Sequence, residues 1–252
     1  MKTSASSIRL LASVLPLLAI PAFAAPSADL ATAAKKLADA PSYAWTSTTQ
    51  IAHTDFPAMP SEGVTEKGGF TVTTRTFNGN SSQTVRKGTE LVMQNRDGDW
   101  VTMEEMRAQF SGGQAGGGGG QRGGGRGGFG GGLFGGAANP AETLGQLAAK
   151  LKNLQAEGDT LTATVTGEEA ATLLAPPGGR GGQGQGPKYA SITVKFWLKD
   201  GAITQYSTHT LGTMTLPGGE DRELDTTTTV EFKNIGTAKV EVPEAAKKKF
   251  TS

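Results

Sequence analysis

The stretch that decides the fold is residues 188–243, KYASITVKFWLKDGAITQYSTHTLGTMTLPGGEDRELDTTTTVEFKNIGTAKVEVP. In its first run every second residue is apolar, and this set is Ile192, Val194, Phe196 and Leu198. A period of two is typical of a strand with one buried face. Asp200-Gly201 follows as a hairpin dipeptide, and Asn234-Ile235-Gly236 predicts a second tight turn. The stretch therefore predicts a four-strand antiparallel meander that ends at Pro243, which cannot donate to a ladder.

The first 24 residues have the pattern of a signal peptide. Lys2 and Arg9 give a basic start, residues 10–20 are mostly apolar, and an Ala-Phe-Ala sequence ends at Ala24. The alternative is a membrane anchor, but the apolar run is shorter than the ~20 residues of a spanning helix. We therefore expect cleavage between Ala24 and Ala25, a periplasmic or secreted protein, and no transmembrane segment in the mature chain.

Charge and cysteine content restrict the partners and the source of stability. The chain has 24 basic and 23 acidic side chains, so nothing favours a nucleic-acid partner electrostatically. The segment QRGGGRGGFGGG resembles RNA-binding arginine-glycine tracts, but it supplies only Arg122 and Arg126. For an exported chain we expect a flexible linker or a self-association tail instead. Without cysteine, the core alone must stabilise the fold.

Glycine dominates residues 112–139 and recurs at residues 176–187. Such segments lose much chain entropy on ordering and bury little, so we expect a disordered insertion and a second glycine-rich loop. The pattern predicts one domain in two parts, with residues 25–111 as its first half and residues 140–252 as its second.

Helices and strands alternate through both halves. We expect helices at residues 27–40, 102–110, 140–154 and 167–175, and strands at residues 43–51, 69–77, 82–86, 89–94, 100–101 and 159–166. The first helix carries an apolar stripe of Leu30, Ala33, Ala34 and Leu37. Thr102 and Glu105 are spaced as a capping box. Residues 56–61 contain two prolines and are interpreted as a loop.

Chemistry-bearing motifs give no indication of an enzyme. The only histidines are His53 and His209, and neither has neighbours spaced as metal ligands. No nucleophile motif and no cofactor fingerprint occurs outside the glycine tracts, where matches follow from composition. We therefore expect no metal, no cofactor and no catalytic residue.

Large aromatic side chains are the better candidates for a binding site. Trp197 lies on the strand face opposite Phe196, where it would need a second cover or a ligand, or would be half exposed near an edge. The predicted lining of an apolar cavity is Trp45, Phe70, Trp100, Phe196, Trp197, Tyr206 and Phe232.

The order of these elements, with the sequences at residues 194–203 and 230–243, resembles the periplasmic LolA/LolB-like half-barrel proteins and the LppX/LprG-type lipid carriers. The resemblance implies an α+β fold in which a curved antiparallel sheet, or half-barrel, packs on a few helices and encloses an apolar cavity. It also implies a non-enzymatic carrier or sensor.

Two functional hypotheses follow. The first is an exported protein that binds an apolar ligand, a lipid or a lipoprotein acyl chain, in the half-barrel cavity. The alternative is an envelope protein-interaction or assembly module whose core is filled by its own side chains and whose glycine tract acts as a tether. The expected partner is a hydrophobic small molecule or lipid in the first case, and a lipoprotein or envelope protein in the second.

Overall fold

The computed structural model describes residues 26–52, 59–77, 79–95, 97–112, 139–174, 188–215 and 220–250. The helices in these ranges are α1 (Pro26–Asp39), α2 (Met103–Gly112), α3 (Pro140–Lys150), α4 (Gly167–Leu174), α5 (Glu244–Lys247) and the 3-10 turn η1 (Lys248–Phe250). The strands are β1 (Ser42–Ile51), β2 (Met59–Glu66), β3 (Phe70–Phe77), β4 (Asn80–Lys87), β5 (Glu90–Gln94), β6 (Trp100–Thr102), β7 (Gln155–Glu157), β8 (Thr160–Thr166), β9 (Lys188–Lys199), β10 (Ala202–Thr215) and β11 (Asp221–Lys233). The predicted signal peptide, residues 113–138 of the first glycine-rich segment and residues 176–187 lie outside the described residues.

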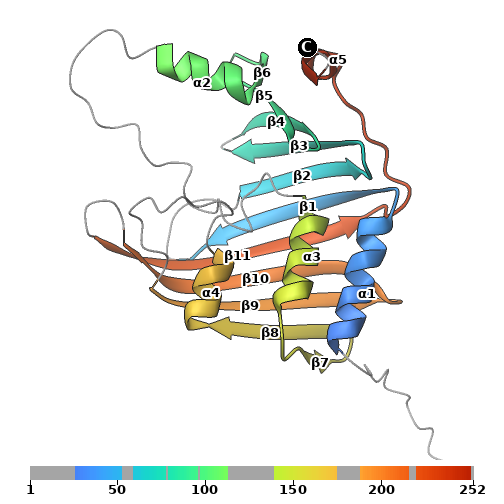
Figure 1. Ribbon diagram of the computed structural model, residues 1–252, viewed down its shortest axis with the longest axis vertical. Helices are drawn as coiled ribbons and strands as arrows, with labels where there is room; N and C mark the ends of the chain where they lie inside the picture. Colours follow the sequence, from blue (N-terminus) through green and yellow to red (C-terminus); the bar gives the residue numbers. More distant parts are fainter. Residues whose placement is uncertain are drawn as a thin grey trace, which may run out of the picture.

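All eleven strands form one antiparallel sheet in the order β6-β5-β4-β3-β2-β1-β11-β10-β9-β8-β7. The two halves of the chain meet where β1 pairs with β11, and Trp45 lies opposite Phe232 there. Because β6 and β7 lie at opposite ends of this order, the sheet is open (Figure 1). The predicted class, α+β with an antiparallel half-barrel sheet, is confirmed.

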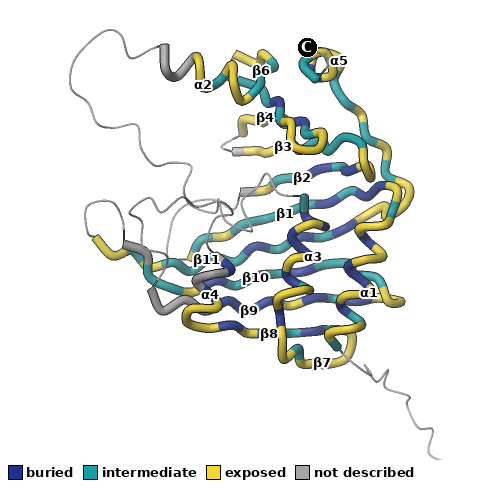
Figure 2. Tube along the Cα trace, viewed as in Figure 1, coloured by how far each residue is buried: buried dark blue, intermediate teal, exposed yellow. Residues whose placement is uncertain are grey.

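Helices α1, α3 and α4 cross one face of the sheet, over the strands from β1 to β8 (Figure 1). This face carries the core, and buried residues follow the strands beneath these helices (Figure 2). The four residues of the predicted stripe on α1 are all buried, as are Leu144, Leu147 and Leu151 at α3. Periodicity therefore identified the packing face of α1.

The deciding stretch forms three of its four predicted strands. In β9 the four alternating apolar residues are at most 6% exposed, and Asp200 and Gly201 form the turn into β10. The fourth prediction is wrong: residues 238–243 are not a strand. β11 already pairs with β1 on one side and β10 on the other, so no edge is left for a further hairpin partner. The chain leaves the sheet after Lys233, and in the turn that follows the N–H of Gly236 donates to the carbonyl of Ser42 at 2.7 Å.

Strand β2 is the main element that the sequence pattern did not predict. Its sequence, MPSEGVTE, contains a proline, a glycine and two glutamates, and lacks apolar alternation. The loop interpretation of residues 56–61 is therefore wrong for residues 59–61, which pair with β1. Pro60 lies opposite Thr48 near the start of the strand, where proline is tolerated. Residues 56–58 lie outside the described ranges.

The other strands predicted in the first half are confirmed. β3, β4, β5 and β6 pair in sequence, with turns at residues 88–89 and 97–98. The capping box at α2 is formed, because the Glu105 N–H donates to Thr102 Oγ1 and the Thr102 N–H donates to Glu105 Oε2.

The C-terminal segment runs from the centre of the sheet to its β6 end (Figure 1). There the ring of Phe250 packs edge-on against Phe70 at 5.4 Å, and Lys249 pairs with Glu105 of α2 at 2.6 Å. Phe70 shares its sheet face with Val85 and Val92 by register, and both valines are buried. This end of the sheet is thus packed on the face opposite to the one that α1 and α3 cover.

Candidate functional site

Four of the seven predicted lining residues belong to the packed core beneath the helices. Trp45, Phe196, Tyr206 and Phe232 are at most 6% exposed. Tyr206 contacts both phenylalanines, with ring centroids 6.4 Å from Phe196 and 6.0 Å from Phe232. Burial raises the pKa of Tyr206, so its hydroxyl stays neutral. These rings fill space against one another.

The other three predicted residues lie on the opposite face. Trp197 is opposite Gln205 on β10 and Thr160 on β8 in register, away from Phe196. Phe70 packs against Phe250, and Lys87 Nζ lies 5.3 Å from the Phe70 ring centre. Trp100 pairs with Gln94 and so shares the face of Val92. The seven residues therefore do not meet around one space.

A groove lies instead on the helix-facing side of the first half, between the start of α3 and strands β2 to β5. Its volume is about 270 Å³. Its lining residues are Thr65, Glu66, Gly68, Gly69, Thr71, Thr73, Arg75, Thr84, Arg86, Gly88, Leu91, Met93, Asn139 and Glu142.

Cross-strand register arranges this surface in three rows. The first row is Tyr43, Thr65, Thr71, Arg86 and Leu91, and the second is Trp45, Gly63, Thr73, Thr84 and Met93. The third row, which we call the serine row, is Ser47, Ser61, Arg75 and Ser82. Threonine dominates the middle of the groove, while Leu91 and Met93 form an apolar wall on β5.

The two arginines of the groove differ in their hydrogen bonds and ion pairs. Arg86 is engaged, because its Nε donates to the carbonyl of Gly88 at 2.8 Å and its guanidinium lies 3.7 Å from Glu142. Arg75 retains solvent exposure and has no hydrogen bond or ion pair to any other residue in the described part of the chain. Desolvation by surrounding atoms lowers the pKa of Arg75. One cation at the groove is thus left without a protein partner among the described residues.

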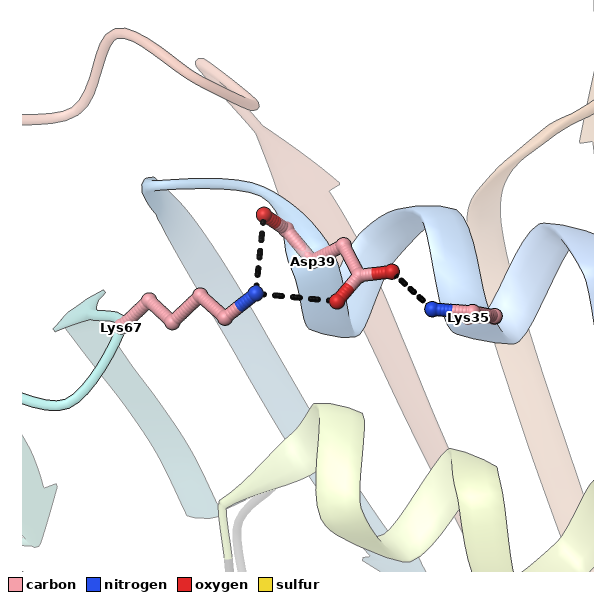
Figure 3. A network of polar contacts seen from close by, with 3 residues as sticks. All are labelled: Lys35, Asp39 and Lys67. Atoms are coloured by element: carbon pink, nitrogen blue, oxygen red, sulfur yellow. Dashed lines mark hydrogen bonds and ion pairs between the residues drawn. The ribbon is translucent and has the colours of Figure 1, made fainter.

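The turn between β2 and β3 closes one end of the groove and is fixed to α1. Lys67 donates to Asp39 Oδ1 at 2.9 Å and to its carbonyl at 3.4 Å, and Lys35 binds the other carboxylate oxygen (Figure 3). These hydrogen bonds lower the pKa of Asp39 to about 2. Gly68 then takes a positive φ of 69°, which favours glycine, and with Gly69 lines the groove.

The start of α3 is fixed by its cap. Asn139 Oδ1 accepts from the N–H of Ala141 at 3.0 Å and from the hydroxyl of Tyr43 on β1. The pKa of Tyr43 is raised mainly by burial. This contact places Asn139 and Glu142 beside the threonines of the sheet.

Trp45 reaches from β1 over β2 toward the groove. A Cβ atom at Gly63 would lie 2.5 Å from Trp45 Cζ2, so the indole lies directly over this glycine. Gly63 in turn pairs with Thr73, which lines the groove. Trp45 Nε1 is buried and has no hydrogen-bond partner, which is the only such side-chain atom among the described residues.

Sequence reasoning missed this groove, although a signal for it exists. In FTVTTRT, residues 70–76, Thr71, Thr73 and Arg75 alternate with a second set that begins with the apolar Phe70 and Val72, and the first set faces the helices. The predicted lining consisted of aromatic side chains, and on β3 the only one of these, Phe70, belongs to the second set.

Only one of the two histidines lies within the described ranges. His209 pairs with Asp225 at 3.0 Å on the face opposite the helices, and His53 lies outside the described ranges. No group of three or more potential metal ligands of the His, Cys, Asp or Glu type occurs among the described residues. None of the helices in the described ranges has the length and apolar content of a membrane span.

No family model matches the chain, and no curated protein matches it. Solved structures do. LprF from Mycobacterium bovis matches 88% of this chain and 97% of its own at 12% identity, with a TM-score of 0.44. Lipoprotein LppX from Mycobacterium tuberculosis matches 88% and 100% at 13% identity and a TM-score of 0.43. A LolA superfamily protein from Nitrosomonas europaea matches 86% and 94% at 8% identity and a TM-score of 0.35. Each of these three matches covers at least 86% of this chain.

Proposed function

We propose that this protein is an exported, non-catalytic binding protein whose ligand is an amphiphile of the lipid class, held in the groove over β2 to β5. The observation that carries the proposal is the contrast between the two parts of the helix-facing surface. Beneath the helices the aromatic side chains fill the space, whereas the surface beside α3 forms a groove of about 270 Å³.

The size and lining of the groove define the ligand class. Small-molecule pockets usually measure about 300–1,000 Å³, so this groove suits one head group with part of a single chain rather than a whole diacyl lipid. Leu91 and Met93 offer apolar contact, and the threonines present both methyl and hydroxyl groups. Burying one large apolar group contributes about 1.5–3 kcal/mol, so a few such contacts support micromolar binding.

A binding role fits the groove better than a catalytic one. Its hydroxyl groups belong to threonines, and its lining includes no histidine or cysteine that would act as a base or nucleophile. Thr71 Oγ1 donates to Thr65 Oγ1 at 3.3 Å, so these hydroxyls bond to each other. Such a surface of hydroxyl and methyl groups suits ligand binding.

The test compares two substitutions on neighbouring residues of β3. Thr73→Trp places a large ring in the groove, and Thr74→Trp places the same ring on the opposite face. With laurate as the probe, native mass spectrometry and calorimetry should show that the first variant loses binding and the second retains it. Circular dichroism verifies that both are folded. Equal binding by the two variants, or no binding by the folded wild type, would contradict the proposal.

The packed core favours a second candidate, a protein-interaction module with the glycine-rich segment as a tether. Its supporting observation is that Phe196, Tyr206 and Phe232 leave the helix-covered part of the sheet filled. Deleting residues 112–136 separates the candidates. Laurate binding should survive the deletion if the protein is a carrier, whereas capture of an envelope partner should be lost if the segment is the tether.

A further inference from the structure

We propose that the serine row, with Arg75 at its centre, is an anion subsite, so that the ligand of the groove carries a carboxylate or phosphate group. This inference rests on the proposed function and narrows its ligand class. Arg75 lies directly opposite Ser61 on one neighbouring strand and Ser82 on the other, and Ser47 continues the row on β1. A guanidinium flanked by hydroxyl donors is the set of groups that binds an oxyanion.

The position of Arg75 sets the direction of the ligand. Thr71, Thr73 and Arg75 are successive helix-facing residues of β3, so about 13 Å of strand separates the first from the last. Glu66 and Glu142 lie at the Thr71 end, where Arg86 already pairs with Glu142. An anion is therefore repelled at that end and attracted at the Arg75 end.

The remaining contacts follow from the row order. With its anionic group at Arg75, a ligand would extend over Thr73 and Thr84 and place its apolar part against Met93 and Leu91. Arg75 has no carboxylate partner within the described residues, so an incoming oxyanion displaces no existing ion pair there. Arginine also forms paired, parallel hydrogen bonds to carboxylate and phosphate, which lysine does not.

The test measures discrimination between a charged and an uncharged form of one chain. Calorimetry compares laurate with methyl laurate, and inorganic phosphate serves as the free anion. Wild type should bind laurate at least about tenfold more tightly than the ester, as a charge-assisted hydrogen bond implies. Arg75→Met should remove this preference and leave ester binding intact, while Arg75→Lys should restore part of it. Lys87→Met, the same loss of charge on the opposite face, should keep the full preference.

The outcomes separate this inference from the proposed function. If the wild type binds the ester as tightly as laurate, or if Lys87→Met loses the preference as Arg75→Met does, the anion subsite is refuted and the carrier proposal stands. If neither laurate nor methyl laurate binds the folded protein, the anion subsite and the carrier proposal are both refuted. If phosphate alone displaces laurate with comparable affinity, the subsite is supported and the ligand is a free anion rather than a lipid.

Discussion

Replacing Gly63 with alanine should destabilise the protein, although alanine is the better residue in a regular strand. Gly63 has no positive φ, so its backbone accepts a side chain, and a Gly→Ala change at such a site normally stabilises by about 0.4–1 kcal/mol. Here the new methyl group would lie 2.5 Å from Trp45 Cζ2 and 2.6 Å from Cε2. Carbon atoms prefer about 3.5–4.0 Å, so the indole must retreat by about 1 Å in a packed region. Overpacking of this kind costs about 1–3 kcal/mol.

A double-mutant cycle with Trp45→Leu assigns the cost to this contact. In the Trp45→Leu background the ring is gone, and Gly63→Ala should become neutral or stabilising, which gives a coupling free energy of about 2 kcal/mol. Urea unfolding followed by far-UV circular dichroism measures all four proteins without relying on the tryptophan signal. Gly145→Ala on α3, where nothing lies within 4 Å of the added methyl, is the matched control and should stabilise. The packing argument would be refuted if Gly63→Ala had the same free energy of unfolding as the wild type. It would also be refuted if Gly63→Ala lost the same free energy of unfolding in the wild-type and Trp45→Leu backgrounds.

Three further predictions concern other parts of the molecule. The pKa of Asp39 is lowered from 3.8 to about 2, so its contribution to stability should be complete above about pH 4 and lost as the pH falls toward 2. Asp39→Asn should remove this part of the pH dependence of the free energy of unfolding, measured with urea. If the variant kept the same pH dependence, the stabilisation of the Asp39 carboxylate by Lys35 and Lys67 would be contradicted. Phe250→Ala should lower the free energy of unfolding by about 2 kcal/mol, because the half-buried ring loses its contact with Phe70, whereas Phe250→Tyr should not. N-terminal sequencing of the exported protein should begin at Ala25, and an intact Met1 would rule out cleavage.

Local periodicity carried the prediction of individual elements. The alternation in β9 and the stripe of α1 depend on residues a few positions apart, and all of these residues are buried as the patterns indicate. The sequence pattern did not predict β2, because the residues of this strand suit its contacts in the folded sheet rather than an apolar alternation. Gly63 leaves room for an indole, and Ser61 belongs to a polar row, so the apolar alternation that marks a strand is missing.

The candidate site was less predictable because both faces of the first half are covered. The prediction placed Phe70 in the lining of a cavity, whereas the face that carries Phe70 packs near the C-terminal segment and Arg75 faces the helix side. Alternation separates two faces but does not say which one lies beneath a helix. The groove also depends on where α3 begins, and this is set by the bond between Asn139 and Tyr43, 96 positions apart.

The pairing of β1 with β11 has a consequence for biosynthesis. Thr49 and Thr228 share a hydrogen bond across 179 positions, so a nascent chain exposes the edge of β1 until almost all of it has left the ribosome. Contacts this distant in sequence form slowly, because a long loop must close first. The sheet is therefore completed only after synthesis, and until then the unpaired edge needs protection from aggregation.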